Sequence, residues 1–146
     1  MKHYNSTILI NSNEKLQFTD ITRKIKEIVK ESEIKNGIAS VYSTHTTSCI
    51  RVNENESRLI DDFRSFLEEL APSSSSYKHD DIELRDCPKD ERINAHSHLK
   101  SLLLGASETL PISNNKIQLG KWQSIFHVDL DGGNRKRTII VNIIGE

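Results

Sequence analysis

Polar side chains with catalytic potential interrupt two strand-forming segments in the sequence STHTTSCIRVNENES, residues 43–57. His45 separates the two segments, and Asn53 and Glu54 follow the second one, directly before a helical pattern. Side chains at the ends of regular elements are held by a rigid scaffold and often carry function. Glu54 is therefore a candidate general acid or base, although a carboxylate at this position also complements the positive end of a helix dipole.

The chain contains six histidines, at positions 3, 45, 79, 96, 98 and 127. Imidazole is the commonest zinc ligand, but no pair of these histidines has the spacing of a helical zinc clamp. In a helix, His96 and His98 project about 200° apart, so only one of them can face a common site. His98 shares a helix face with Asn94, four residues earlier. We expect His96 to lie at the surface and His127 to be a half-buried structural residue of a strand.

A basic segment follows a glycine-rich turn near the C-terminus. Arg135, Lys136 and Arg137 come directly after residues 131–134, whose sequence is DGGN. Guanidinium groups beside exposed backbone amides suit a phosphate or carboxylate ligand. The same residues also suit the solvated surface of a hairpin, and the sequence leaves both interpretations open.

The helices that would position these residues are predicted from apolar spacing and from helix breakers. Three are expected: one after Thr19 or Asp20 that ends near residues 36–37, one from residues 55–57 to Pro72, and one over residues 92–104. Gly105 closes the third helix, and its predicted inward face consists of Leu99, Leu102 and Leu103.

Strands are predicted where β-branched and aromatic residues cluster between turn signals. They cover residues 7–10, 38–44, 48–52, 109–112, 116–119, 122–130 and 136–144. The turn at residues 131–134 predicts a hairpin between the last two strands. The sequence therefore predicts an α+β domain whose C-terminal half is largely antiparallel.

The length and charge of the chain restrict its class. With 146 residues we expect one domain over residues 1–146. Lys and Arg number 20 against 21 Asp and Glu, which argues against general affinity for nucleic acids or anionic membranes. The chain has no apolar run of the roughly 18 residues needed to span a bilayer and no signal peptide, so we expect a cytoplasmic protein. Cys49 and Cys87 lack paired spacing and are expected to be reduced thiols.

Six short motifs together resemble one known family. They are HTT at residues 45–47, NE at 53–54, Y-x-HD at 77–80, N-x-x-x-HL at 94–99, LGKWQ at 119–123 and DGGNRKR at 131–137. In this order, over nearly the whole chain, they resemble the YjbQ family, small proteins often described as secondary thiamine-phosphate synthases. Lys121 stands where the family usually has threonine, and Asn115 stands where it usually has a turn glycine.

The resemblance implies a structure and a set of site residues. The structure would be an α+β sandwich of a mixed, largely antiparallel sheet with helices, assembled as a homotrimer with histidine-lined pockets at subunit boundaries. His45, His79 and His98 would bind a divalent metal ion, with Asn53 and Glu54 beside it. Three imidazoles favour zinc, whereas diphosphate chemistry usually uses magnesium with oxygen ligands.

The implied reaction joins hydroxymethylpyrimidine diphosphate to a thiazole phosphate and releases pyrophosphate. In this hypothesis Arg135 and Arg137 hold phosphate oxygens, while Gln123, Asn94 or Asn53 binds the rest of the substrate. The mismatch between imidazole ligands and diphosphate chemistry suggests that this reaction is a side activity. Two other functions remain open: metal-assisted hydrolysis of a small metabolite with Glu54 as base, and a non-catalytic trimeric module that binds a metal ion or small anion.

Overall fold

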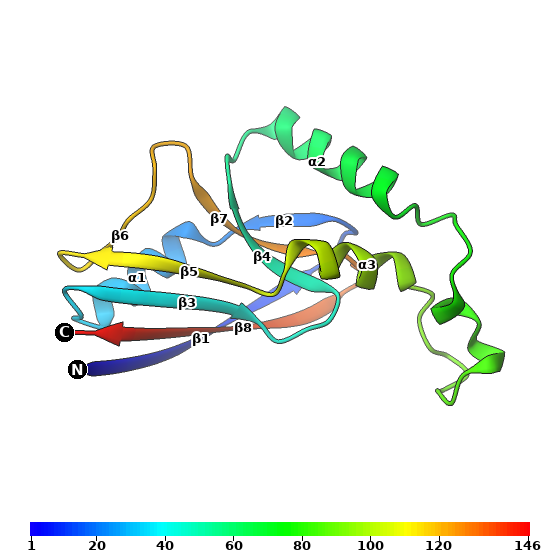
Figure 1. The fold of residues 1–146 in the computed structure, drawn as a ribbon, viewed down its shortest axis with the longest axis horizontal. Helices are drawn as coiled ribbons and strands as arrows, with labels where there is room; N and C mark the ends of the chain where they lie inside the picture. Colours follow the sequence, from blue (N-terminus) through cyan, green and yellow to red (C-terminus); the bar gives the residue numbers. More distant parts are fainter.

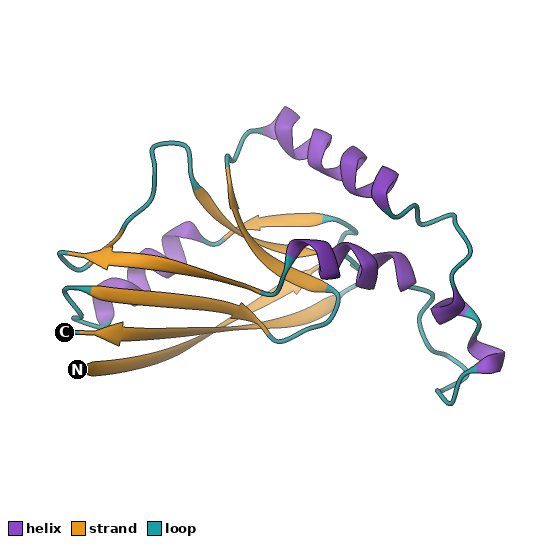
Figure 2. Cartoon of the chain, viewed as in Figure 1, coloured by secondary structure: helices purple, strands orange, loops and turns teal.

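The computed structural model describes all 146 residues as two antiparallel sheets with three α-helices (Figures 1 and 2). The elements, in chain order, are β1 (Lys2–Ser12), β2 (Gln17–Asp20), α1 (Thr22–Glu31), β3 (Gly37–Ser43), β4 (Ser48–Asn53), α2 (Ser57–Leu70), the 3-10 turns η1 (Lys78–Asp80) and η2 (Ile82–Leu84), α3 (Ala95–Leu104), β5 (Ser107–Ser113), β6 (Lys116–Ile117), β7 (Ser124–Asp129) and β8 (Arg135–Gly145). The predicted α+β class is confirmed. No helix is long and apolar enough to cross a bilayer.

The strands divide into a five-stranded sheet, in the order β1-β8-β3-β5-β6, and a three-stranded sheet, in the order β2-β7-β4. Every neighbouring pair is antiparallel. β1 pairs with β8 along its whole length, from Lys2 opposite Gly145 to Ser12 opposite Arg135. The two termini therefore lie side by side at one end of the molecule, and β8 begins at the other end (Figure 1).

The main core lies between the five-stranded sheet, α1 and one face of the three-stranded sheet. It contains 17 buried apolar residues, including Ile25 of α1, Val141 of β8, Ile50 of β4 and Ile125 of β7. A smaller cluster, which includes Phe126 and Val128, lies on the other face of β7 and packs against Leu67 of α2. Because side chains alternate along a strand, β7 contributes to both clusters.

The predicted hairpin between the last two strands is wrong. β7 pairs with β2 and β4, whereas β8 pairs with β1 and β3, so the DGGN turn carries the chain from one sheet to the other. Three successive residues of this turn have a positive φ: Gly132 (69°), Gly133 (75°) and Asn134 (51°). The glycines adopt such angles without a Cβ clash, which lets the chain change direction between the sheets.

The limits of several elements differ from the prediction. β1 is 11 residues long, and β2 was not predicted. α1 ends at Glu31, before residues 36–37, because Glu33 has a positive φ of 54° and cannot continue a right-handed helix. At the other end of α1, Asp20 Oδ1 accepts a hydrogen bond of 2.8 Å from the Thr22 N–H.

The predicted inward face of α3 is wrong for the single chain. Leu99, Leu102 and Leu103 are 41%, 80% and 66% exposed. The buried face instead carries the residues Ala95, His96, Ser97 and Lys100. Ser97 Oγ donates to the Leu130 carbonyl at 2.8 Å, and Lys100 Nζ donates to Glu68 at 2.8 Å, so polar contacts fix the rotation of this helix.

Candidate functional site

The site lies where the chain changes sheets twice, at the end of the molecule opposite the termini. Residues 44–47 lead from β3 to β4, and residues 130–134 lead from β7 to β8. One backbone hydrogen bond joins the two connections, from the Leu130 N–H to the Thr47 carbonyl at 3.0 Å. A second joins the first connection to β8, from the Thr44 N–H to the Thr138 carbonyl at 3.2 Å. The connections therefore form one rigid surface.

A buried ion pair lies beneath this surface. Arg137 donates to both carboxylate oxygens of Asp129, from Nε at 2.6 Å and from Nη2 at 2.7 Å, and the two residues are 2% and 0% exposed. Burial alone would raise the pKa of Asp129, but the hydrogen bonds from Arg137 and from the Gly132 N–H lower it to about 2. Arg137 Nη2 also donates to Thr47 Oγ1 at 3.1 Å, so only Nη1 remains unused within the chain.

A second carboxylate, Asp131, organises the residues above this pair. It is 2% exposed and forms an ion pair with Arg92 Nε at 3.0 Å. It also accepts hydrogen bonds from Asn94 Nδ2 at 3.0 Å and from Arg135 Nη2 at 3.1 Å. Asn94 is only 4% exposed, yet its Oδ1 has no hydrogen-bond partner, and neither has the buried Nε of Arg135. The structure thus brings Asn94 and Arg135 together and leaves polar atoms of both unpaired.

The three histidines selected by the family resemblance lie next to this cluster. The rings of His79 and His98 are 4.7 Å apart between centroids, in an edge-to-face arrangement. His45 and His98 line the same surface depression of about 320 Å³. Burial, then the charges of Arg137 and Arg135, lowers the pKa of His45, and burial, then His79, lowers the pKa of His98. Both rings are therefore biased toward the neutral form, which can accept a proton or coordinate a metal ion.

The three imidazoles do not form a finished metal site in this arrangement. No group of three or more His, Cys, Asp or Glu side chains has a geometry that could hold a metal ion. His45 Nε2 accepts a hydrogen bond of 2.9 Å from the Thr138 N–H. A neutral ring that accepts at Nε2 carries its proton on Nδ1 and has no second lone pair for a metal ion. The rings of His79 and His98 are neighbours, whereas His45 could coordinate an ion beside them only if it released the Thr138 N–H.

Three predicted site residues lie elsewhere in the chain. Asn53 and Glu54 are at the far end of β4, a strand of six residues whose ends are roughly 17 Å apart at about 3.3 Å per residue. Asn53 Oδ1 accepts from the Glu54 N–H at 2.8 Å. Gln123 precedes β7, at the end remote from Asp129, and its Oε1 accepts from the Gly120 N–H at 2.8 Å. Within one chain, none of the three lies beside the histidines.

Two further expectations about polar residues are corrected. His96 was expected at the surface but is 3% exposed, because the buried face of α3 is the polar one. Asp80, the neighbour of His79, accepts a hydrogen bond of 3.0 Å from the Ala95 N–H at the start of α3. Glu56 accepts hydrogen bonds from the N–H groups of Arg58 and Leu59 and so caps α2. The helix-terminal role considered for Glu54 therefore belongs to Glu56.

Sequence reasoning missed Arg92, Asp129 and Asp131. The spacing of Asp131 and Arg135, four residues apart, was the available local signal. This signal was not used because residues 131–134 were predicted to form a hairpin turn, beside which such a pair would be exposed. Arg92 could not be found from spacing, because it meets Asp131 across 39 positions of the sequence.

The fold and site define a class of protein: a two-sheet α+β domain with an arginine-, aspartate- and histidine-rich surface at the connections between its sheets. The chain belongs to the YjbQ family, since a family model described as "UPF0047 protein YjbQ-like" matches residues 6–146. A UPF0047 protein of Methanothermobacter thermautotrophicus is 40% identical over 100% of this chain and 95% of its own length. The UPF0047 protein YugU of Bacillus subtilis is 30% identical over 95% of this chain and 98% of its own.

Solved structures agree with this assignment. The crystal structure of a YbjQ-like protein of unknown function from Sulfolobus solfataricus is 37% identical, with a TM-score of 0.89 over 99% of both chains. A YjbQ/UPF0047 family protein from Clostridium acetobutylicum is 34% identical, with a TM-score of 0.84 over 95% of this chain and 99% of its own. The predicted family is therefore confirmed.

A buried histidine beside the site makes stability depend on pH. His127 is 0% exposed and has no hydrogen-bond partner at either ring nitrogen, and burial lowers its pKa from 6.5 to about 4. Between these values the unfolded chain binds a proton that the folded chain does not, so stability falls as the pH is lowered through this window. His127 therefore accounts for the binding of about one proton on unfolding, which lowers the free energy of unfolding by roughly 3 kcal/mol across this pH window. We expect His127→Leu to remove this contribution.

Urea unfolding at pH values from about 4.5 to about 7 measures this effect. His3→Leu, which changes an exposed histidine, is the matched control and should leave the pH dependence as it is in the wild type. An unchanged slope in His127→Leu would contradict a buried, neutral ring.

Proposed function

We propose that this chain binds the phosphate groups of a small metabolite at the surface formed by Arg92, Arg135 and the three histidines. The observation that carries the proposal is the pairing of both arginines with Asp131. Their side chains are held side by side, are 38% and 37% exposed, and keep Nη1 donors that bond to nothing within the chain. Around Asp129 and Asp131 three arginines face two aspartates, so the surface retains positive charge for an anion.

The charge of this surface supports the transfer reaction that the family resemblance implied. In that reaction a C–O bond to diphosphate breaks while the thiazole nitrogen forms a C–N bond, and negative charge grows on the departing diphosphate. Fixed guanidinium groups stabilise such charge without reorganisation. The thiazole nitrogen uses its lone pair and loses no proton, so the reaction needs no general base.

The position of Glu54 separates this reaction from the hydrolytic alternative. Hydrolysis requires a base to activate water, and the predicted base, Glu54, lies at the other end of β4. His45 or His98 would have to take this role, which their lowered pKa values allow. Within one chain, the separation therefore favours transfer of the pyrimidinylmethyl group, with diphosphate as the leaving group, over hydrolysis with Glu54 as base. A module that binds anions without turnover is the remaining alternative.

The anion site can be tested with Arg135→Gln. We expect its affinity for pyrophosphate and for hydroxymethylpyrimidine diphosphate to fall about tenfold or more, because a charge-assisted hydrogen bond is worth about 1.5–3 kcal/mol. Calorimetric titration measures the affinity, and thiamine phosphate formation measures turnover. Arg23→Gln, whose side chain is 87% exposed on α1, is the control. Equal weakening by both variants would contradict a specific site, and binding without turnover would favour the non-catalytic module.

We also propose a divalent metal ion at His79 and His98, with His45 as a third ligand after it releases the Thr138 N–H. Imidazole ligands favour zinc, which would polarise a substrate oxygen, whereas magnesium would be bound mainly through the oxygens of a diphosphate. Elemental analysis of protein purified without a histidine tag should find about one transition-metal ion per chain after incubation with zinc. His98→Ala should lose this ion and the control His3→Ala should keep it. A metal-free wild type would overturn the proposal.

The exposed leucines of α3 support assembly as a homotrimer. Leu102 is 80% exposed and borders the depression that contains His45 and His98, so a second chain seated there would cover apolar surface and enclose the site. We expect light scattering to give about three times the 16.7 kDa of one chain. Leu102→Glu should dissociate the assembly, whereas Leu84→Glu, at an 85% exposed residue of η2, should not. A monomeric wild type would contradict the assembly.

We propose that the protein is located in the cytoplasm. Cys49 and Cys87 are both free, as expected for a reducing compartment.

A further inference from the structure

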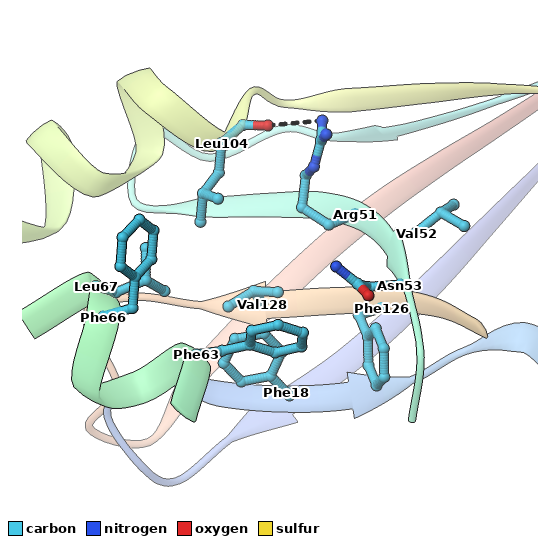
Figure 3. Close-up of a pocket in the computed structure, with 10 residues that line it drawn as sticks. All are labelled: Phe18, Arg51, Val52, Asn53, Phe63, Phe66, Leu67, Leu104, Phe126 and Val128. Atoms are coloured by element: carbon cyan, nitrogen blue, oxygen red, sulfur yellow. Dashed lines mark hydrogen bonds between the residues drawn. The ribbon is translucent and has the colours of Figure 1, made fainter. Parts of the chain in front are cut away.

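A second pocket, of about 300 Å³, lies under α2 on the face of the three-stranded sheet that points away from the main core (Figure 3). All four phenylalanines of the chain line it: Phe18, Phe63, Phe66 and Phe126. The Phe18 ring lies 5.7 Å from Phe63 at an interplanar angle of 31°, and 5.9 Å from Phe126 at 81°. The rings therefore present both faces and edges to the space between them.

Polar contacts from two residues of α2, Arg64 and Glu68, hold this helix over the sheet and the pocket. Leu67 is its only fully buried residue. Lys100 Nζ bonds to Glu68 at 2.8 Å, and Arg64 Nε donates to the Leu16 carbonyl at 3.2 Å. These contacts fix the helix while Phe66 stays 58% exposed. The apolar surface beneath α2 is consequently accessible without any movement of the helix.

The two polar residues of the pocket restrict the charge of its ligand. Arg51 forms an ion pair with Glu108 at 3.1 Å and donates to the Leu104 carbonyl at 2.9 Å, so its charge is balanced within the chain. Asn53 uses its Oδ1 for the Glu54 N–H and keeps its Nδ2 as a free donor on the pocket side of β4 (Figure 3). An anion would find no unpaired cation here, whereas a neutral molecule with one acceptor atom would be complemented.

We propose that this pocket binds a small, flat, uncharged aromatic molecule that accepts one hydrogen bond from Asn53. Aromatic walls in two orientations favour stacking on one ring and edge contacts with another. A volume of about 300 Å³ suits one or two fused rings, at the lower end of the range for small-molecule sites. The pocket shares no residue with the histidine and arginine surface and lies at the other end of β4, so the inference does not depend on the function proposed above.

The test uses two neutral molecules with the intact chain. N-phenyl-1-naphthylamine becomes fluorescent in an apolar site and reports occupancy, and quinoline, which has one ring-nitrogen acceptor, competes with it. We expect saturable binding of the fluorophore and its displacement by quinoline. Phe66→Ser should weaken fluorophore binding about tenfold, which corresponds to about 1.4 kcal/mol, because one aromatic contact is lost. Asn53→Leu should weaken quinoline more than the fluorophore, because it removes the hydrogen-bond donor of the pocket and leaves the aromatic walls in place.

Leu70→Ser is the matched control, because Leu70 is a 50% exposed apolar residue of the same helix that does not line the pocket. It should leave both affinities within twofold of the wild type, and circular dichroism checks that each variant is folded. Equal effects of Phe66→Ser and Leu70→Ser would overturn the proposal. So would fluorophore binding that falls as the protein associates, which would assign the face to a second copy of the chain.

Discussion

The buried ion pair between Asp129 and Arg137 is the interaction on which the site depends. It joins β7 to β8, two strands that belong to different sheets and share no backbone ladder. Asp129 also accepts from the backbone N–H groups of Asp131 and Gly132, so one carboxylate shapes the whole connection. Removal of either partner would leave a buried charge uncompensated, which typically costs about 3–5 kcal/mol. The positions of Asp131 and Arg135 in this connection follow from the anchor.

The alternation of side chains along β4 and β7 explains how so small a domain supports two different surfaces. On β7, His127 and Asp129 point to one side, whereas Phe126 and Val128 point to the side of α2. The first side leads to the charged surface at the connections between sheets, and the second forms the wall of the aromatic pocket. Because the strand is shared, a one-residue change of register would exchange the two sets of side chains and abolish both surfaces.

Much of the secondary structure could be predicted because it depends on local spacing. The strands at β3 and β4 and the helix that ends before Pro72 were found in this way. The wrong predictions share a cause: a local pattern does not specify which distant strand or side chain a segment will contact. Residues 131–134 have the residue types of a hairpin turn, yet β8 pairs with the full length of β1 and not with β7. The leucines of α3 have core spacing, yet Ser97 and Lys100 find polar partners that turn the other face inward.

The sequence by itself determined the fold class, the family and the identity of the three histidines and of Arg135 in the candidate site. These depend on residue types and short motifs, which are local properties of the chain. Only the tertiary structure decided which of them meet. In the fold, Arg92 and Arg135 both pair with Asp131, whereas Arg137 is buried in a pair with Asp129. Glu54 is separated from the histidines by the length of β4. The pair of Asp131 and Arg135 is local, but its burial and its contact with Arg92, 39 residues away, arise from the packing of distant segments, about which residue spacing carries no information.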